Sequence, residues 1–265
     1  MCALPHSKAR IAVHKFTSCD GCQLAFLNLG ETLVQLAELA DIVHFAEAGP
    51  IAPDAQVDVA FVEGSITTPH DLDRIRQVRD NCTWLVTIGA CATAGGVQAL
   101  RGLADAKTWI SEIYASPEYI DSLATSTPIA DHVKVDLELW GCPVNSRQVL
   151  GALRTLMSGV MPADEEDKVC LECKRRQNVC VVVARDLPCM GPVTRTGCGA
   201  LCPSFGRDCY GCYGPAENTN TRALSRRLEG LGLVREEIAR RYLSINNGAP
   251  DFRRAGTEWK GPDDG

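Results

Sequence analysis

Eight cysteines fall between positions 170 and 212, and no other stretch of the chain is so rich in this residue. They are Cys170, Cys173, Cys180, Cys189, Cys198, Cys202, Cys209 and Cys212. A chain of 265 residues that is 45% hydrophobic can bury a proper core, so it does not need these cysteines as disulfide bridges in order to fold. The segment also has many glycines and prolines and little hydrophobic periodicity. We therefore expect its order to come from something other than a hydrophobic core.

The start of the chain, Met1 to His6, contains neither an apolar signal core nor a twin arginine. No run of about 18 apolar residues exists that could span a membrane. We therefore expect a cytoplasmic protein with no membrane partner, in a compartment where thiols stay reduced and clustered cysteines tend to bind metal. The net charge of −6 argues against a nucleic-acid partner.

Strand and helix patterns alternate before residue 162. Strands are expected at residues 9–16, 41–47, 57–63, 83–88 and 133–139. Helices are expected at 22–39, from Pro69 through Val78, at 93–100 and from Asn145 through Leu156, with a partly helical excursion over 101–131. This alternation predicts an α/β fold with a doubly wound, flavodoxin-like parallel sheet.

The alternation stops after Pro162. A charged linker at 164–168 leads into the cysteine-rich segment, residues 217–243 return to a helical pattern, and the last 20 residues show no clear pattern. The sequence therefore predicts a flavodoxin-like domain at 1–162, an irregular cysteine-rich domain at 163–214, and a C-terminal helix and tail at 215–265.

Four further cysteines follow the predicted strands. Strand one leads into Cys19 and Cys22, strand four into Cys91, and strand five into Cys142. The carboxyl ends of parallel strands share one edge of a sheet, so these four thiols are expected to meet there. Four thiolates are what a cubane iron–sulfur cluster requires, and the neighbouring glycines leave amide N–H groups free to bond sulfur.

A core-packing role or a zinc site would account for these four cysteines less well than an iron–sulfur cluster does. Single cysteines such as Cys91 are often ordinary core residues, but that does not explain three strand ends at once. A structural zinc site is the stronger alternative, although zinc usually takes its ligands from local knuckles. Neither a P-loop nor a G-x-G-x-x-G motif is present, so a nucleotide site is unsupported.

The eight later cysteines match the number needed for two four-iron clusters. Cys198, Cys202 and Pro203 reproduce the C-x3-C-P end of the bacterial ferredoxin motif. Two zinc knuckles would use only half of the eight, and disulfides would require export. Cys2 and Cys82 receive no ligand role, because the other twelve already make three sets of four.

Several motifs in order resemble the small subunit of [NiFe] hydrogenases over about residues 10–214. The first half contains Cys19-x2-Cys22, Glu63-Gly64-Ser65, Gly89-Ala90-Cys91 and Gly141-Cys142-Pro143-x-Asn145. The second half contains Cys173-Lys174-Arg175-Arg176, Cys189-Met190-Gly191-Pro192, Cys202-Pro203 and Cys209-x-Gly211-Cys212. The absence of an export signal makes the cytoplasmic branch the better match. Within that branch the chain most resembles the delta subunit of NADP-dependent bidirectional hydrogenases, or sulfhydrogenases.

The resemblance implies three [4Fe–4S] clusters and a ligand set for each. The proximal set is Cys19, Cys22, Cys91 and Cys142; the medial set is Cys198, Cys202, Cys209 and Cys212; and the distal set is Cys170, Cys173, Cys180 and Cys189. In many relatives the medial cluster has three irons, and here Cys198 supplies the fourth cysteine. The sequence does not decide whether the medial and distal clusters exchange ligands with each other.

The resemblance also implies the partners. Heterolytic H2 cleavage in this family takes place in a large subunit with a nickel–iron centre, so no residue of this chain is expected to be catalytic. The chain would relay electrons in both directions between that centre and a flavin- and NADP(H)-binding subunit, with a further iron–sulfur subunit. Sulfur reduction, a deazaflavin-reducing hydrogenase and a structural zinc protein stay open as alternatives.

Overall fold

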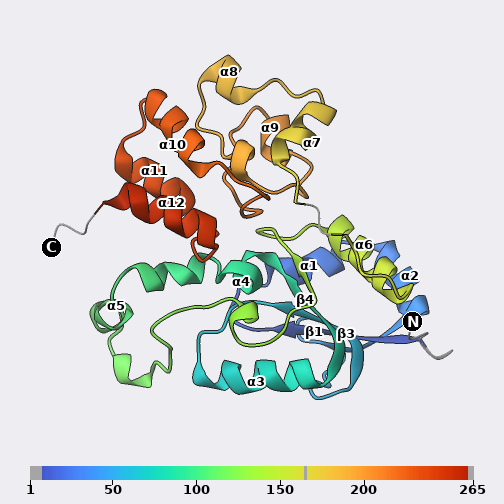
Figure 1. Ribbon diagram of the computed structural model, residues 1–265. Coiled ribbons are helices and arrows are strands. Elements are labelled where there is room, and N and C mark those ends of the chain that lie inside the picture. The colour runs from blue at the N-terminus through green and yellow to red at the C-terminus, as the bar shows by residue number, and fades with distance from the viewer. Residues whose placement is uncertain (1–7, 164–165, 262–265) are drawn as a thin grey trace.

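A computed structural model describes residues 8–163 and 166–261 (Figure 1). Five strands form one parallel sheet with the order β2-β1-β3-β4-β5. The strands are β1 Ala9–Lys15, β2 Ala40–Phe45, β3 Val57–Glu63, β4 Cys82–Ile88 and β5 Leu137–Leu139. This is the flavodoxin-like strand order, so the predicted fold class is confirmed.

Three helices cover one face of the sheet: α1 Gly21–Leu27, α2 Glu31–Leu39 and α6 Ser146–Met157. Phe26 of α1 packs edge-to-face on Phe61 of β3, with ring centroids 5.1 Å apart. Asn145 caps α6 by accepting hydrogen bonds from the amides of Arg147 and Gln148, as predicted.

Helix α3, Pro69–Asp80, covers the other face. It begins with Pro69 and a capping box between Thr68 and Asp71, and it buries Ile75 and Val78 against the sheet. Because both faces are covered, the central strands are apolar on both sides.

The excursion between β4 and β5 is mostly short helical turns. They are α4 Gly89–Ala94, the 3-10 helix η1 Val97–Leu103, α5 Ala106–Ile113, η2 Pro117–Tyr119 and η3 Ile129–Asp131. The helix predicted at 93–100 is wrong in its bounds, because α4 begins directly at the end of β4 and the chain turns at Gly95 and Gly96.

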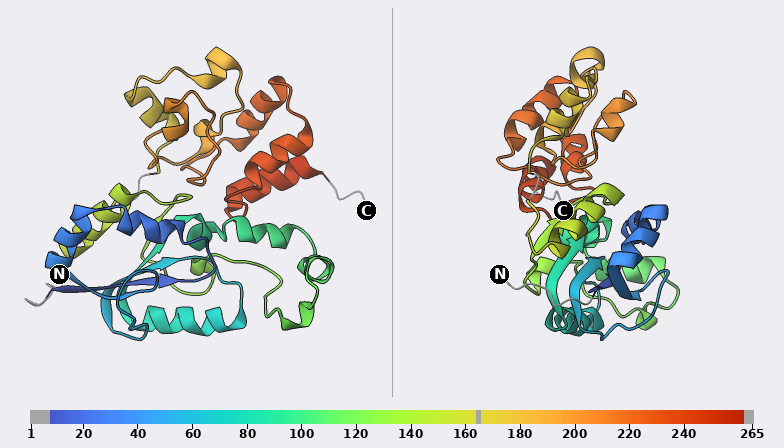
Figure 2. Two further views of the ribbon diagram at one scale, coloured as in Figure 1. Left: turned by 180° about the vertical axis from the view of Figure 1, so that it is seen from behind. Right: turned by 90° about the vertical axis from the view of Figure 1, so that its right-hand side faces the viewer.

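The remaining elements form a separate mass beyond the carboxyl edge of the sheet (Figure 1, Figure 2). In the cysteine-rich segment they are α7 Val169–Arg175, α8 Val181–Arg185, η4 Gly191–Val193 and α9 Leu201–Ser204. They are followed by α10 Thr221–Gly230, α11 Arg235–Tyr242 and α12 Pro250–Lys260.

The cysteine-rich segment shares a hydrophobic core with these C-terminal helices. Val181 and Met190 pack in one buried cluster with Leu228, Ile238 and Phe252. The expectation that this segment lacks a hydrophobic core is therefore wrong. The apolar side chains that complete the core come from α10, α11 and α12, further along the chain.

Two predicted helices are each divided. The helix predicted at 22–39 is α1 and α2, separated at Gly30, whose φ is +56°. The helix predicted at 217–243 is α10 and α11, separated at Gly232, whose φ is +93°. Both φ values lie in the left-handed region that favours glycine.

The last 20 residues are not without structure, because α12 buries Phe252 and Ala255. The C-terminal part is thus three helices rather than one helix and a tail. None of the helices in the described ranges has the length and apolar character needed to cross a bilayer.

Two histidines are buried next to each other on neighbouring strands of the sheet. His14 of β1 and His44 of β2 have ring centroids 4.7 Å apart and are 2% and 3% exposed. Nδ1 of each ring has no hydrogen-bond partner among the described residues. Burial, together with the nearby His44 and Arg74, lowers the pKa of His14 to about 3. Burial and Arg74 also lower the pKa of His44.

We expect the protein to lose stability as the pH falls below about 6.5. Below that pH the unfolded chain binds a proton at His14 that the folded chain excludes, which costs up to about 1.4 kcal/mol per pH unit. In His14→Phe, the change in free energy of unfolding between pH 7 and pH 5.5, measured by anaerobic urea titration, should be smaller than in the wild type. His70→Phe, at an exposed position on α3, is the control and should keep the wild-type pH dependence. An unchanged pH dependence in His14→Phe would show that the buried pair does not set acid sensitivity.

Candidate metal centres

Cys19, Cys22, Cys91 and Cys142 come together at the carboxyl edge of the sheet. Burial, together with the neighbouring thiols of Cys142 and Cys19, raises the pKa of Cys91 to about 12. Burial also raises the pKa of Cys22, which lies near Cys91 and Cys142. The four strand-end cysteines thus form one electrostatically interacting group. Cys19 and Cys142 are exposed to solvent, whereas Cys22 is buried.

Glu63 fixes the start of α1 from the neighbouring strand. It stands at the end of β3 and is 1% exposed. Its carboxylate accepts hydrogen bonds from the backbone amides of Cys22 at 3.0 Å and Gln23 at 3.3 Å. Burial raises the pKa of this carboxyl group, and the two amide bonds oppose that shift. Glu63 therefore orients the turn that carries Cys22.

Glycine keeps the space beside the Cys22 sulfur open. Gly89, at the end of β4, has a φ of +84°, and a Cβ added there would lie 2.2 Å from the Cys22 sulfur. A side chain at this position would meet both a strained backbone and a collision with the sulfur. The absence of a side chain leaves room for a group bound to the sulfur.

A second group of thiols, which includes Cys198, Cys202 and Cys212, lies against the strand-end group. Burial, together with the thiols of Cys198, Cys142 and Cys202, raises the pKa of Cys212 to about 12. Cys142 belongs to the strand-end group, so Cys212 links the sheet edge to the cysteine-rich segment.

The third group is formed by the first four cysteines of the dense segment. Burial, together with the neighbouring thiols of Cys189, Cys173 and Cys180, raises the pKa of Cys170 to about 11. A Cβ added at Gly191 would lie 3.4 Å from the Cys189 sulfur and 3.6 Å from the Cys170 sulfur. These two sulfurs therefore border the same small space.

Cys209 joins the second group to the third. It is 5% exposed, and its backbone amide donates a hydrogen bond to the Cys189 sulfur at 3.2 Å. Its own pKa is raised by burial and then by the thiols of Cys189 and Cys212, one from each group. The three groups therefore form a continuous series, but these contacts do not assign Cys209 to one group alone.

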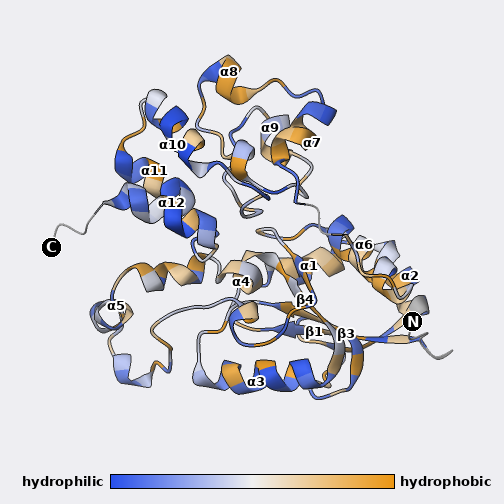
Figure 3. Cartoon of the chain, viewed as in Figure 1, coloured by the Kyte–Doolittle hydropathy of each residue, from blue (hydrophilic) through white to orange (hydrophobic). Residues whose placement is uncertain are grey.

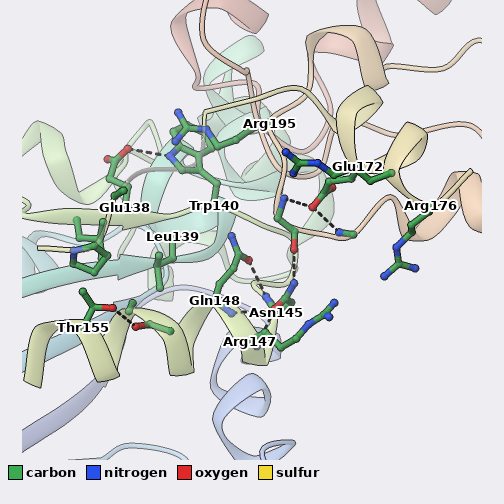
Figure 4. Close-up of a pocket in the computed structure, with 18 residues that line it drawn as sticks. Glu138, Leu139, Trp140, Asn145, Arg147, Gln148, Thr155, Glu172, Arg176 and Arg195 are labelled. Carbon is green, nitrogen blue, oxygen red and sulfur yellow. Dashed lines mark hydrogen bonds between the residues drawn. The ribbon is translucent and has the colours of Figure 1, made fainter. Parts of the chain in front are cut away.

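The loop around Cys198 is held by two polar side chains from different elements (Figure 4). Glu172 of α7 accepts hydrogen bonds from the amides of Gly197 at 3.0 Å, Gly199 at 3.1 Å and Ala200 at 3.2 Å. Asn145, which caps α6, donates a hydrogen bond to the Gly197 carbonyl. The same asparagine therefore connects the sheet domain to the Cys198 loop.

Sequence patterns did not reveal the positioning roles of Glu63 and Glu172. Glu172 lies inside the Cys170-x2-Cys173 motif, and a carboxylate between two thiol ligands is a signal that could have drawn attention to it. Glu63 lies in one of the motifs that resemble the hydrogenase small subunits. Its contact with the turn after β1 was missed because that contact depends on β3 lying beside β1 in the sheet.

Cys82 stands apart from the three groups. It is buried at the start of β4, where burial raises its pKa to about 11, and its thiol donates to the Arg79 carbonyl at 3.6 Å. It belongs to the core between the sheet and α3. Cys2 lies outside the described residues.

The donor chemistry of the three groups fits iron–sulfur clusters. Buried, crowded thiols are neutral when no cation is present, and bound metal stabilises them as thiolates. Across residues 8–163 and 166–261, no three histidine, cysteine or carboxylate side chains converge closely enough to hold a single metal ion.

Comparison with known proteins gives consistent matches. A family model described as NADH ubiquinone oxidoreductase, 20 Kd subunit, matches residues 19–156. Sulfhydrogenase 2 subunit delta of Pyrococcus furiosus is 35% identical over 89% of this chain and 98% of its own length. A subunit of the F420-non-reducing hydrogenase of Methanocaldococcus jannaschii is 28% identical, over 79% of this chain and 83% of that subunit.

Solved structures share the fold. One chain of an NAD+-reducing [NiFe]-hydrogenase in the H2-reduced state aligns with a TM-score of 0.55 and 24% identity, covering 60% of this chain and 96% of that one. A chain of the [NiFeSe] hydrogenase from Desulfovibrio vulgaris Hildenborough aligns with a TM-score of 0.55 and 15% identity, over 80% and 95% of the two chains.

Gly89→Ala should selectively empty the strand-end group, because the new methyl group collides with the Cys22 sulfur. We expect lower metal content and, under native conditions, faster alkylation of Cys19, Cys22, Cys91 and Cys142, located by mass spectrometry. Gly151→Ala is the matched control, since a Cβ there meets nothing within 4 Å and alanine suits the middle of α6. Equal metal content and thiol protection in both variants would contradict the role of this space.

Proposed function

The chain belongs to the NADH ubiquinone oxidoreductase 20 kDa subunit family and, within it, to the hydrogenase small subunits, and from this membership we propose that it relays electrons through three [4Fe–4S] clusters. The observation that carries the proposal is the continuous series of thiol groups. Cys142 neighbours Cys212, and Cys209 donates to Cys189, so each group touches the next.

Each cluster is assigned four ligands. The proximal cluster takes Cys19, Cys22, Cys91 and Cys142; the medial takes Cys198, Cys202, Cys209 and Cys212; and the distal takes Cys170, Cys173, Cys180 and Cys189. When bound, such clusters accept and release single electrons. The division of the chain into residues 1–162, 163–214 and 215–265 follows from the same assignment, with one cluster in the first part and two in the second.

Backbone amides of this chain donate hydrogen bonds to two of the proposed ligand sulfurs. The Cys209 amide donates to the Cys189 sulfur at 3.2 Å, and the Gly211 amide donates to the Cys209 sulfur at 3.5 Å. Amide hydrogen bonds to thiolate sulfur stabilise added negative charge and so raise reduction potential. The shared core excludes water from Cys189 and Cys209, which are buried within it.

A [NiFe] large subunit is the partner proposed at the proximal site. Cys19 and Cys142 are exposed, and the elements that carry Cys22 and follow Cys91 also expose Leu24, Val97 and Leu100. An apolar surface of this kind beside exposed thiols is typical of an interface that a partner covers. The nickel–iron centre of that partner would cleave H2, while this chain carries the electrons.

The terminal acceptor is proposed to be NADP(H), reached through a flavin-binding subunit and a further iron–sulfur subunit in the cytoplasm. The 35% identity to the Pyrococcus furiosus sulfhydrogenase subunit supports an assembly of the sulfhydrogenase type, and the choice of NADP(H) rests on the resemblance to that branch of the family. A deazaflavin acceptor and sulfur reduction are the alternatives within the same class. A structural zinc protein is the alternative from another class.

Metal analysis of the anaerobically purified complex tests the proposal. Three four-iron clusters in this chain should contribute about twelve irons per complex, in addition to the iron of the partner subunits, with broad absorption at about 400 nm that bleaches on reduction by H2. The large subunit should co-purify. Stoichiometric zinc in a colourless protein would contradict the proposal.

The medial assignment has a separate test at Cys198. Cys198→Pro should convert the medial cluster to a three-iron form, visible by EPR in the oxidised protein. Cys82→Ala, which removes a buried cysteine from outside the three groups, should leave the spectrum unchanged. If no three-iron signal appears in Cys198→Pro or in Cys198→Ala, then Cys198 is not a medial ligand.

A further inference from the structure

A pocket opens between the sheet domain and the cysteine-rich segment, beside the loop that carries Cys198 (Figure 4). Its volume is about 580 Å³, which lies in the range of small-molecule sites. Its walls come from β5, α6, α7 and the turn at 197–199. No cysteine is among the described residues that line it, so the pocket is distinct from the three thiol groups.

One end of the pocket has its charges balanced within the protein. Arg195 lies there, with its guanidinium 5.2 Å from the centroid of the Trp140 ring and 3.8 Å from the Glu166 carboxylate. Glu138 accepts a hydrogen bond from Nε1 of Trp140 at 3.1 Å. The charged side chains at this end therefore have partners already.

Elsewhere in the pocket, two guanidinium groups converge without a counter-charge. A Cβ added at Gly199 would lie 2.8 Å from Nη2 of Arg176 and 3.5 Å from Nη2 of Arg147, so both groups stand beside the same glycine. Figure 4 shows them on the same side of the pocket, one from α7 and one from α6. Neither they nor Arg175, a third cation of the lining, form an ion pair with a carboxylate in the described part of the chain.

The hydrogen-bonding groups beside these arginines offer donors rather than acceptors. The Glu172 carboxylate is occupied, because it accepts hydrogen bonds from three backbone amides of the Cys198 loop. Gln148 accepts a hydrogen bond from the Asn145 amide through Oε1 at 3.3 Å. Its Nε2 has no hydrogen-bond partner among the described residues and remains available as a donor.

The chemistry of the lining fits a phosphate attached to an apolar body. Two guanidinium groups held close together repel each other unless an anion lies between them. Their planar forks match the oxygens of a phosphate, which can accept hydrogen bonds from both. Figure 3 shows strongly hydrophilic residues at the end of α7 and the start of α6. The lining also has an apolar part, formed by Leu139, Ala152 and Pro162, which a bare ion would leave unused.

We propose that this pocket binds an organic phosphate, with its phosphate between Arg147 and Arg176 and its apolar body against Leu139 and Pro162. Arg147 belongs to the sheet domain and Arg176 to the cysteine-rich segment. The bound phosphate therefore ties the two together at the loop that carries Cys198. This site goes beyond the proposed electron relay and does not depend on it, because no proposed cluster ligand lines the pocket.

Protection of individual arginines from phenylglyoxal, located by mass spectrometry, tests the proposal in the anaerobically purified complex. Phenyl phosphate is the probe, with inorganic phosphate and sodium chloride as references. Phenyl phosphate should slow the modification of both Arg147 and Arg176. Half-protection should need about tenfold less of it than of inorganic phosphate, because the ring adds apolar contact. Sodium chloride at the same ionic strength should not protect either residue.

Single substitutions test whether the two arginines share one ligand. Arg147→Gln should raise the concentration of phenyl phosphate that half-protects Arg176 about tenfold, because one charge-assisted contact is lost. Arg176→Gln should weaken the protection of Arg147 in the same way. Arg154→Gln is the matched control, since this arginine is exposed on the same helix but does not line the pocket. It should leave the protection of Arg176 as in the wild type.

Three results would each overturn the proposal. Arginines that stay unreactive without the probe would show that another subunit covers the pocket. Equal protection by inorganic phosphate and phenyl phosphate would show an adventitious ion only. An equal loss of Arg176 protection in Arg147→Gln and Arg154→Gln would show a general effect of charge instead of a shared ligand. The electron relay is judged separately, from the iron content of the complex and its bleaching by H2.

Discussion

Desolvation of crowded thiols is the constraint on which this structure depends. Cys22, Cys91, Cys209 and Cys212 lie where burial raises their pKa far above that of a free thiol, and neighbouring thiols raise it again. Such groups carry negative charge only when a cation compensates it. If metal binds these groups as proposed, its binding would contribute directly to folding, because it would stabilise as thiolates the thiols that burial otherwise keeps neutral.

The two halves of the molecule are joined where the first two thiol groups meet. Cys142 follows β5 and faces Cys212, while Asn145, three residues later, caps α6 and bonds the Gly197 carbonyl. From the other side, Glu172 holds the amides of the same loop. A shift of this loop would change the distance between the two groups, so these polar contacts help to set that distance as well as the interdomain geometry.

The sheet and the strand-end site could be predicted because they follow from local patterns and one topological rule. Apolar runs indicate the strands, and parallel strands place Cys19, Cys91 and Cys142 at one edge. The breaks at Gly30 and Gly232 were missed because hydrophobic periodicity continues across both turns. The core of the cysteine-rich segment was missed because Val181 and Met190 are completed by Phe252 of α12, and such long-range packing has no signature in a local window. Glu172 was missed for the same reason, since its three amide partners lie 25 to 28 residues away.

The order of the eight cysteines along the chain, from Cys170 to Cys212, differs from the order of their groups in space. Cys212, the last of the eight, lies near Cys142 at the sheet edge, whereas the first four form the third group. The segment therefore runs outward first and returns, and the return brings Cys209 between Cys189 and Cys212. This path explains why the C-terminal helices are needed. They cover the returning stretch of chain and bury Cys209, whereas Cys19 and Cys180, at the two ends of the series, reach solvent.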